Sequence, residues 1–185
     1  MADGLHYADR RTPFMSADQA AVTLSTTAKA LYTTSAFPVL GGHYFSLIGK
    51  KLVLQLFGKI TTAATPGNGS FDIYYGTGAD ANGVLLASSA ALALSASQTN
   101  LSWNCIVSVS CRSTGSTGTL FCQGIAEFNN AVLASTLQPM MIPASAAVVS
   151  GACDLTASLI ISVQFKRSGS TAETMTVQDM DVIAF

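Results

Sequence analysis

Charged side chains are scarce in this sequence, and their scarcity excludes several kinds of protein. Lys, Arg, Asp and Glu make up 10% of the 185 residues, against about 25% in typical soluble domains. Nine basic and ten acidic residues give a formal net charge of -1, so no basic surplus exists for binding nucleic acid. The 49% hydrophobic content excludes a disordered chain. The longest apolar stretch, residues 85–94, contains serines and is too short to cross a bilayer. We therefore expect neither a nucleic-acid nor a membrane partner.

Histidine and glutamate, which many active sites use, are almost absent. The two histidines, His6 and His43, stand outside any His-Glu-x-x-His motif, and no Gly-x-Ser-x-Gly elbow occurs. Glu127 and Glu173 are the only glutamates. The glycine-rich loop at 76–83 lacks the lysine of a phosphate-binding loop. An enzyme of the metal-dependent cupin type would need a cluster of histidines. We predict that the chain is not an enzyme, with no catalytic residue and no cofactor.

Two aspartate pairs are weak signals of paired-carboxylate glycoside chemistry, and one of them is also a candidate metal site. Asp179 and Asp181 share one face of a predicted strand and would be able to bind calcium together with loop carbonyls. Asp72 and Asp80 are the other pair, and no calcium site is predicted for them. A solvated strand edge or a bulge is the favoured interpretation of Asp179 and Asp181, and we predict no metal site.

The four cysteines are expected to be thiols. No apolar signal segment follows Met1, so we expect synthesis in a cytoplasm, where thiols stay reduced. Cys105 and Cys111 lie six residues apart on one predicted strand, roughly 20 Å, and cannot bond each other. A hairpin closing near residues 115 and 116 places Cys122 opposite Val109, which makes a bond to Cys111 unfavourable. Cys153 has no Cys-x-x-Cys neighbour that would indicate structural zinc.

Serine and threonine, about a fifth of the chain, take the place of charge. Such a composition is typical of strands whose outward positions are hydroxyls. It is also typical of a subunit that buries much of its surface in an assembly, since a lone monomer usually carries more charge. The composition therefore favours a β-protein that forms an oligomer.

Alternating apolar residues predict a series of strands. The alternation is clearest at residues 51–62, 71–75, 101–127 and 155–165, with a last strand from 175 to 185. Turn sequences rich in Gly, Pro, Asn and Ser separate them. We predict an all-β fold, a single jelly-roll or β-sandwich of about eight antiparallel strands, over residues 21–185. Residues 1–20 are predicted to be an extended N-terminal arm, which either frays or lies on a neighbouring subunit.

Three aromatic residues would suit a sugar-binding platform. Strand parity, however, places Tyr75 and Trp103 inward, where they fit a core, and Tyr74 outward, where it fits an interface.

Several segments resemble a known group of proteins. These are GKITTAATPG at 58–67, LASSAALALSASQTN at 86–100, CRSTGSTGT at 111–119 and DLT at 154–156. From Lys50 onward the chain resembles small virion structural proteins of tailed bacteriophages. The resemblance implies a jelly-roll subunit of a phage particle and suggests a capsid decoration, or cement, protein. It brings no catalytic residues with it.

The favoured function is therefore that of a decoration subunit that bridges major capsid protein subunits on the outer surface of the phage head. The expected partners are the major capsid protein and further copies of this chain, as a homotrimer. The alternative is a receptor-binding, carbohydrate-binding module of a tail fibre or spike. That alternative predicts exposed amide residues at one end of the sandwich, for instance Asn82, Asn129 and Asn130.

Overall fold

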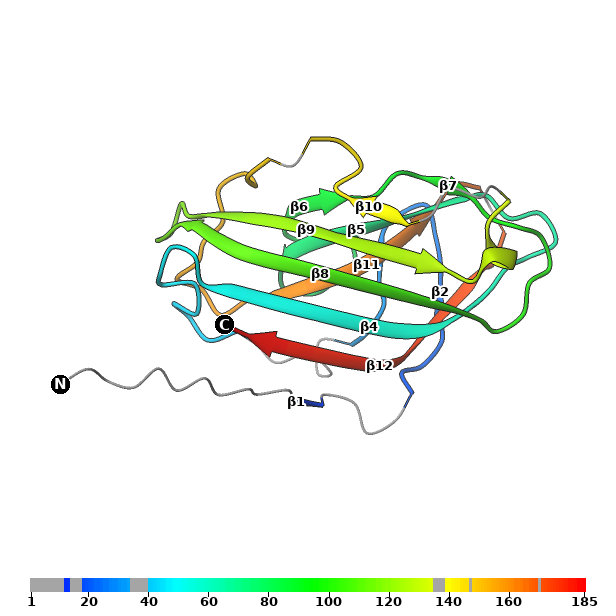
Figure 1. The fold of residues 1–185 in the computed structure, drawn as a ribbon, viewed down its shortest axis with the longest axis horizontal. Coiled ribbons are helices and arrows are strands. Elements are labelled where there is room, and N and C mark those ends of the chain that lie inside the picture. The colour runs from blue at the N-terminus through cyan, green and yellow to red at the C-terminus, as the bar shows by residue number, and fades with distance from the viewer. Residues whose placement is uncertain (1–11, 14–17, 34–39, 135–138, 147, 170) are drawn as a thin grey trace.

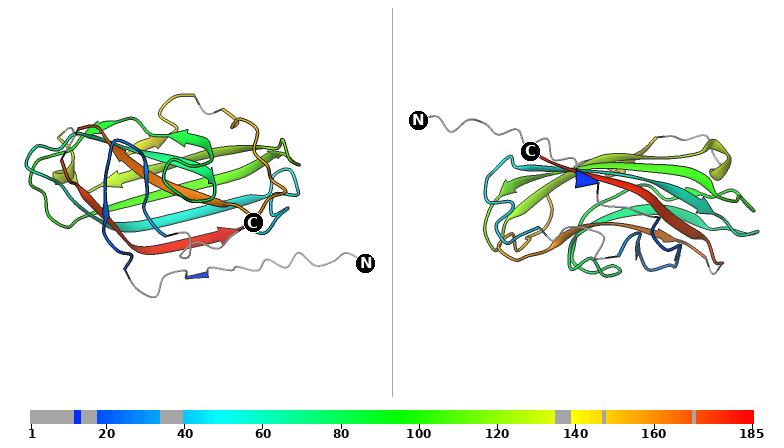
Figure 2. Two further views of the ribbon diagram at one scale, coloured as in Figure 1. Left: turned by 180° about the vertical axis from the view of Figure 1, so that it is seen from behind. Right: turned by 90° about the horizontal axis from the view of Figure 1, so that it is seen from below.

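Two antiparallel sheets pack face to face in a computed structural model of the chain (Figure 1; Figure 2). The structure describes residues 12–13, 18–33, 40–134, 139–146, 148–169 and 171–185. The seven-stranded sheet runs in the order β1 (Thr12–Pro13), β12 (Thr174–Ala184), β4 (Lys51–Thr61), β8 (Leu101–Ser113), β9 (Thr119–Phe128) and β10 (Met140–Ile142), with β2 (Val22–Thr23) also on β12. The five-stranded sheet runs β3 (Lys29–Ala30), β11 (Ile160–Arg167), β5 (Asn68–Gly76) and β6 (Val84–Ser88), with β7 (Leu92–Ala93) also on β5.

The predicted all-β sandwich is confirmed. Among the described residues, eight strands have three residues or more, and the 3-10 turn η2 (Asn130–Val132) is a brief helical piece after β9. The first long strand pairs with the last, β4 with β12, while β5 pairs with β11 in the other sheet. No helix in the described ranges is long and apolar enough to span a membrane.

The core lies between the sheets and follows the predicted alternation. Leu52, Leu54, Leu56 and Ile60 of β4 are fully buried, because strand residues two apart share a face. An aromatic cluster fills one part of the core, where the Phe71 ring lies near three others. Its neighbours are Trp103 at 5.7 Å, Phe128 at 5.7 Å and Phe165 at 4.9 Å between ring centroids.

The β8–β9 hairpin has the predicted register. Val109 pairs with Cys122, as expected from closure near residues 115 and 116. The inward row of β8 is buried from Trp103 to Cys111. Tyr75 and Trp103 are therefore core residues, as strand parity predicted.

Strand β11 differs from expectation at its start and on its outward face. It begins at Ile160, because Leu155 and Thr156 form a turn, and Leu159 is only partly buried. Gln164 lies opposite the alternating apolar row, on the face where a polar residue is expected to meet solvent, yet it is fully buried. Its amide nitrogen donates to the Ala79 carbonyl and its oxygen accepts from the Ala81 N–H, so the loop after β5 covers this face.

The N-terminal segment, as far as it is described, lies along the sandwich. Thr12 and Pro13 pair with Val182 and Asp181 of β12, and β2 pairs further along the same strand. Residues 1–11 and 14–17 of the predicted arm, including His6, lie outside the described residues.

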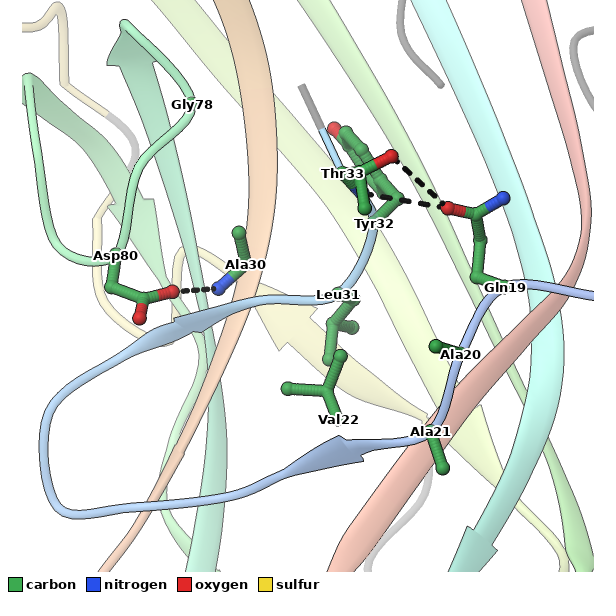
Figure 3. Close-up of a pocket in the computed structure, with 10 residues that line it drawn as sticks. All are labelled: Gln19, Ala20, Ala21, Val22, Ala30, Leu31, Tyr32, Thr33, Gly78 and Asp80. Atoms are coloured by element: carbon green, nitrogen blue, oxygen red, sulfur yellow. Dashed lines mark hydrogen bonds between the residues drawn. The ribbon is translucent and has the colours of Figure 1, made fainter. Parts of the chain in front are cut away.

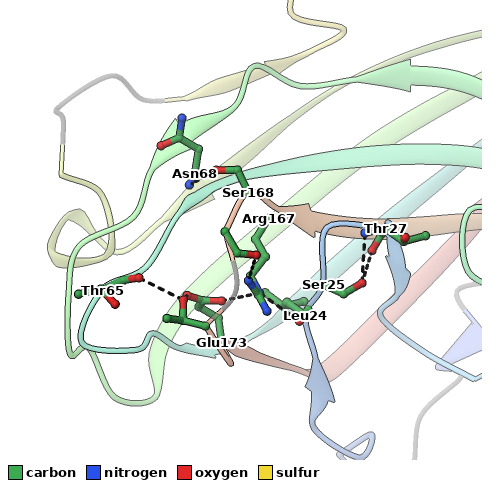
Figure 4. Close-up of polar contacts among 10 residues, drawn as sticks. Leu24, Ser25, Thr27, Thr65, Asn68, Arg167, Ser168 and Glu173 are labelled. Carbon is green, nitrogen blue, oxygen red and sulfur yellow. Dashed lines mark hydrogen bonds and ion pairs between the residues drawn. The ribbon is translucent and has the colours of Figure 1, made fainter.

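A buried ion pair ties this N-terminal segment to the β11–β12 turn (Figure 4). Arg167 Nε lies 2.6 Å from Glu173 Oε2, with the two side chains 8% and 0% exposed. Arg167 Nε also donates to the Leu24 carbonyl at 3.1 Å, and Thr171 Oγ1 donates to Glu173 Oε1 at 2.6 Å. A buried pair of this kind needs such additional hydrogen bonds to offset the loss of water. We interpret the Arg167–Glu173 pair as structural, because it holds the N-terminal segment against the β11–β12 turn.

Candidate functional site

Five exposed apolar residues lie in segments at one end of the sandwich. This is the end where β4 starts and β12 ends (Figure 1). Leu47, Ile48, Val148, Val149 and Phe185 are between 50% and 72% exposed. We call these five residues the apolar end. Hydrogen bonds place them: Gly49 N–H donates to the Cys111 carbonyl beside Ile48, and Phe185 exchanges backbone bonds with Lys51. Val149 forms a bridge to Phe121 at the start of β9.

Three cations at the same end lie over aromatic rings. Lys50 Nζ is 4.3 Å from the centroid of the Tyr44 ring. Arg112 Cζ is 4.7 Å from that of Phe121, and Lys51 Nζ is 5.7 Å from that of Phe185. Contact with the ring faces attracts the cations and limits where they point. The apolar end is therefore bordered by positive charge.

His43 also lies near this end of the sandwich. It is exposed in the loop before β4, and its backbone N–H donates to the Leu155 carbonyl. The nearby Asp154 carboxylate accepts from the Thr156 hydroxyl and N–H, and these bonds lower the pKa of Asp154. Across the described part of the chain, no group of three His, Cys, Asp or Glu side chains is placed to hold a metal ion.

The four thiols are free and buried. Burial raises the pKa of Cys122 to about 12 and raises the pKa of Cys105 further. Cys111 donates from Sγ to the Phe45 carbonyl at 3.4 Å. A thiol that stays protonated is a poor nucleophile and a poor metal ligand, so these side chains act as small core residues.

Asp72 and Asp80, which the sequence suggested as a pair, each form an ion pair with a lysine. Asp72 is 1% exposed and pairs with Lys166 Nζ at 2.8 Å. Asp80 accepts from Lys29 Nζ at 2.6 Å and from the Ala30 N–H. Burial alone would raise the pKa of Asp80, but these two hydrogen bonds and the charge of Lys29 outweigh burial and lower it. Asp179 and Asp181 lie on β12, where Asp179 is exposed and Asp181 is half-buried.

Asp80 also borders a pocket of about 280 Å³ at the seam between the N-terminal segment and β3 (Figure 3). Small and apolar side chains, among them Ala20, Ala21 and Val22, form much of its lining. The Tyr32 hydroxyl is bonded to the backbone of β11, and Gln19 Oε1 accepts from Thr33. We interpret this pocket as a packing seam without chemistry of its own.

A second hollow, of about 400 Å³, lies on the outer face of the seven-stranded sheet, away from the apolar end. Its lining combines an exposed aromatic ring with amide and carboxylate groups: Phe57, Gly58, Ser102, Trp103, Asn104, Glu127, Phe128, Asn129 and Gln178. Of the amides predicted for the sugar-binding alternative, Asn129 lies here. Asn82 lies in the β5–β6 loop of the other sheet.

Sequence reasoning missed the residues that define both surfaces. Leu47 and Ile48 stand in a loop, where an apolar pair is itself a signal of contact with a partner. Phe57 occupies an outward position of a strand whose other outward residues are mostly polar, which would have been a second signal.

No known protein family matches the sequence, and no curated protein matches it either. Solved structures with some similarity include one of botulinum neurotoxin type C, whose cell entry depends on interaction with two ganglioside molecules. This chain shares 10% identity with it, at a TM-score of 0.28. The alignment covers 72% of this chain and 32% of that one. The binding domain of botulinum neurotoxin serotype C1 gives 9% identity, 72% and 33% coverage and a TM-score of 0.27. The CBM2 module of the evolved Dit of Lactobacillus casei BL23 phage J-1 gives 11%, 76% and 67%, and 0.24. This chain spans about a third of the length of the two toxin chains. TM-scores this low carry no inference about function.

Proposed function

We propose that this chain is a structural protein of a bacteriophage particle, a decoration subunit that binds the major capsid protein through the apolar end. The observation that carries the proposal is the gathering of five large exposed apolar side chains at one end of a sandwich that has only 10% charged residues. Exposed apolar patches of this kind are typical of protein contact sites. The resemblance of residues 58–67 and 111–119 to phage virion proteins supports the same role.

The energetics suit attachment in many copies. Burying half to two thirds of a Leu or Ile side chain contributes about 1 kcal/mol, so the apolar end supplies several kcal/mol before the cost of association. Many copies on one particle then act together, so each contact needs only modest affinity. Lys50, Lys51 and Arg112 would complement an acidic capsid surface and make attachment weaker at high salt.

A homotrimer on the outer surface of the head remains part of the proposal. The hydroxyl-rich, weakly charged surface supports burial of further area against copies of the same chain. Size-exclusion chromatography with light scattering tests the trimer: a mass near three times 19.1 kDa is expected, and a monomer across the working range contradicts it.

A pair of matched variants tests attachment. Leu47→Asp places a charge in the apolar end, whereas Leu85→Asp places the same charge on β6 of the five-stranded sheet, where Leu85 is 45% exposed. Capsids prepared without this protein are mixed with each variant and sedimented. We expect Leu47→Asp to reduce co-sedimentation at least tenfold and Leu85→Asp to leave it unchanged. Equal binding by both variants would contradict attachment through the apolar end.

Immunogold labelling of intact particles separates this role from the receptor-binding alternative. An even label over the head is the expected result. A label confined to the tail tip would reject decoration and favour the tail fibre or spike.

A further inference from the structure

One row of side chains crosses four strands on the outer face of the seven-stranded sheet. Register pairs Asp179 of β12 with Phe57 of β4, Phe57 with Asn104 of β8, and Asn104 with Glu127 of β9. With neighbouring strands about 4.8 Å apart, the row is about 14 Å long. It therefore presents a carboxylate, an aromatic ring, an amide and a second carboxylate in line.

Phe57, Asn104 and Glu127 of this row line the hollow described above, and a hydrogen bond joins two of them. Asn104 Nδ2 donates to Glu127 Oε2 at 3.2 Å, which orients both side chains. Gln178 is the extra residue of a bulge in β12 next to Phe57, so it adds an amide at the rim. Its nitrogen donates to Asp18 at 3.1 Å. Asn129 uses its side-chain oxygen to cap η2.

Trp103 and Gly58 line the hollow from the side of the sheet that faces the core. The Trp103 indole is 3% exposed and packs toward Phe71 of the other sheet, and its Nε1–H makes no hydrogen bond within the described residues. Gly58 lies opposite Trp103 in the register, and a Cβ there would come within 2.9 Å of the indole ring.

We propose that this hollow binds a neutral oligosaccharide. Aromatic rings pack against the apolar C–H face of a sugar, and fixed amide and carboxylate groups accept and donate to its hydroxyls. Phe57, 40% exposed, supplies the ring. Asn104, Glu127 and Gln178 supply the polar groups, and a row of about 14 Å admits more than one sugar ring.

Charge selects the class of sugar. The lining of the hollow carries the Glu127 carboxylate and no cation, and Asp179 adds a second carboxylate along the row. Lys59 lies one row further along β4, outside this lining. Phosphate and sialic acid would meet like charge here, so the hollow favours uncharged hexose or N-acetylhexosamine chains.

The hollow is independent of the apolar end. Phe57 lies six positions after Lys51 on β4, about 20 Å along the strand. The hollow lies toward the end of the sandwich where β9 leads into η2, the short coiled ribbon of Figure 1. A subunit attached through the apolar end would keep the hollow open. The inference therefore does not depend on the proposed function, and capsid attachment and sugar binding can fail separately.

The chain carries its own probe for this site, because Trp103 is its single tryptophan. Titration follows the fluorescence of the full chain with hexose and N-acetylhexosamine oligosaccharides of four to six units, and with sialylated chains of equal length. We expect a saturable change with at least one neutral chain at millimolar concentration or below, and at least tenfold weaker binding of the sialylated ones. A shift of the indole N–H resonance in NMR spectra should accompany it.

Matched variants locate the binding. Phe57→Ala should weaken it at least tenfold, and Glu127→Gln at least threefold, whereas Phe185→Ala at the apolar end should leave it unchanged. Phe57→Ala should keep the thermal midpoint of the unaltered chain within a few degrees and still co-sediment with capsids. The inference is overturned if no neutral chain changes the fluorescence or the indole resonance, or if a folded Phe57→Ala variant binds as well as the unaltered chain.

Discussion

Removing one partner of the buried Arg167–Glu173 pair should destabilise the fold strongly. Glu173→Gln keeps the shape of the side chain and its bond from Thr171, but it leaves the guanidinium of Arg167 uncompensated in a site only 8% exposed. Loss of one member of a buried ion pair costs about 3 to 5 kcal/mol of unfolding free energy. With a urea m-value of about 2.5 kcal/mol/M for a domain of this size, the midpoint should fall by roughly 1 to 2 M.

A second variant isolates the charge. Arg167→Met combined with Glu173→Leu removes both charges and fills the space with apolar atoms, so it should be more stable than Glu173→Gln alone. The carbonyl of Leu24 then loses its bond from Arg167, which limits the recovery. Urea unfolding followed by far-UV circular dichroism measures both variants. A loss below about 1 kcal/mol for Glu173→Gln would refute the reasoning, because it would mean that water reaches the guanidinium.

Three further predictions follow from close contacts and buried hydroxyls and thiols. Gly58→Ala places a Cβ 2.0 Å from a backbone carbonyl of β12 and should cost about 3 kcal/mol in urea unfolding, whereas Gly41→Ala, with nothing within 4 Å, should be nearly neutral. Tyr32→Phe leaves an N–H and a carbonyl of β11 unpaired and should lower the thermal midpoint by the equivalent of about 1 to 3 kcal/mol; no change would contradict this. Because burial raises the pKa of Cys122 to about 12 from 9.0, the unfolded chain releases this proton first. Its contribution to stability is complete below pH 9 and falls as the pH rises toward 12, and the fall should be smaller in Cys122→Ala when unfolding is measured across this range.

Local alternation was sufficient to predict the strands and their inward faces. Leu52, Leu54 and Leu56 needed only the two-residue period of a strand, and the pairing of Val109 with Cys122 needed only the position of the turn. The four thiols, expected to be unbonded, are free. These features depend on residues close in sequence, which is why sequence reasoning reached them.

Features that depend on distant segments were not predicted. Gln164 is buried because the loop at 77–83 folds over β11, a contact that no local pattern encodes. The hollow beside Phe57 depends on the bulge at Gln178, and a bulge of this kind has no clear local signature in the sequence. The apolar end brings together two loops and the C-terminal residue, so its members are scattered in sequence from Leu47 to Phe185.

The pairing of β1 and β2 with β12 has a consequence for solubility. One edge of β12 is joined to β4, and in the described residues two strands of two residues each occupy the other edge. A long bare edge offers unpaired N–H and carbonyl groups to any other extended chain and is a starting point for aggregation. The N-terminal segment thus covers part of the edge of β12 and keeps it from pairing with other chains. A chain shortened beyond Thr23 would expose that edge, and copies held at high concentration would then join strand to strand through it.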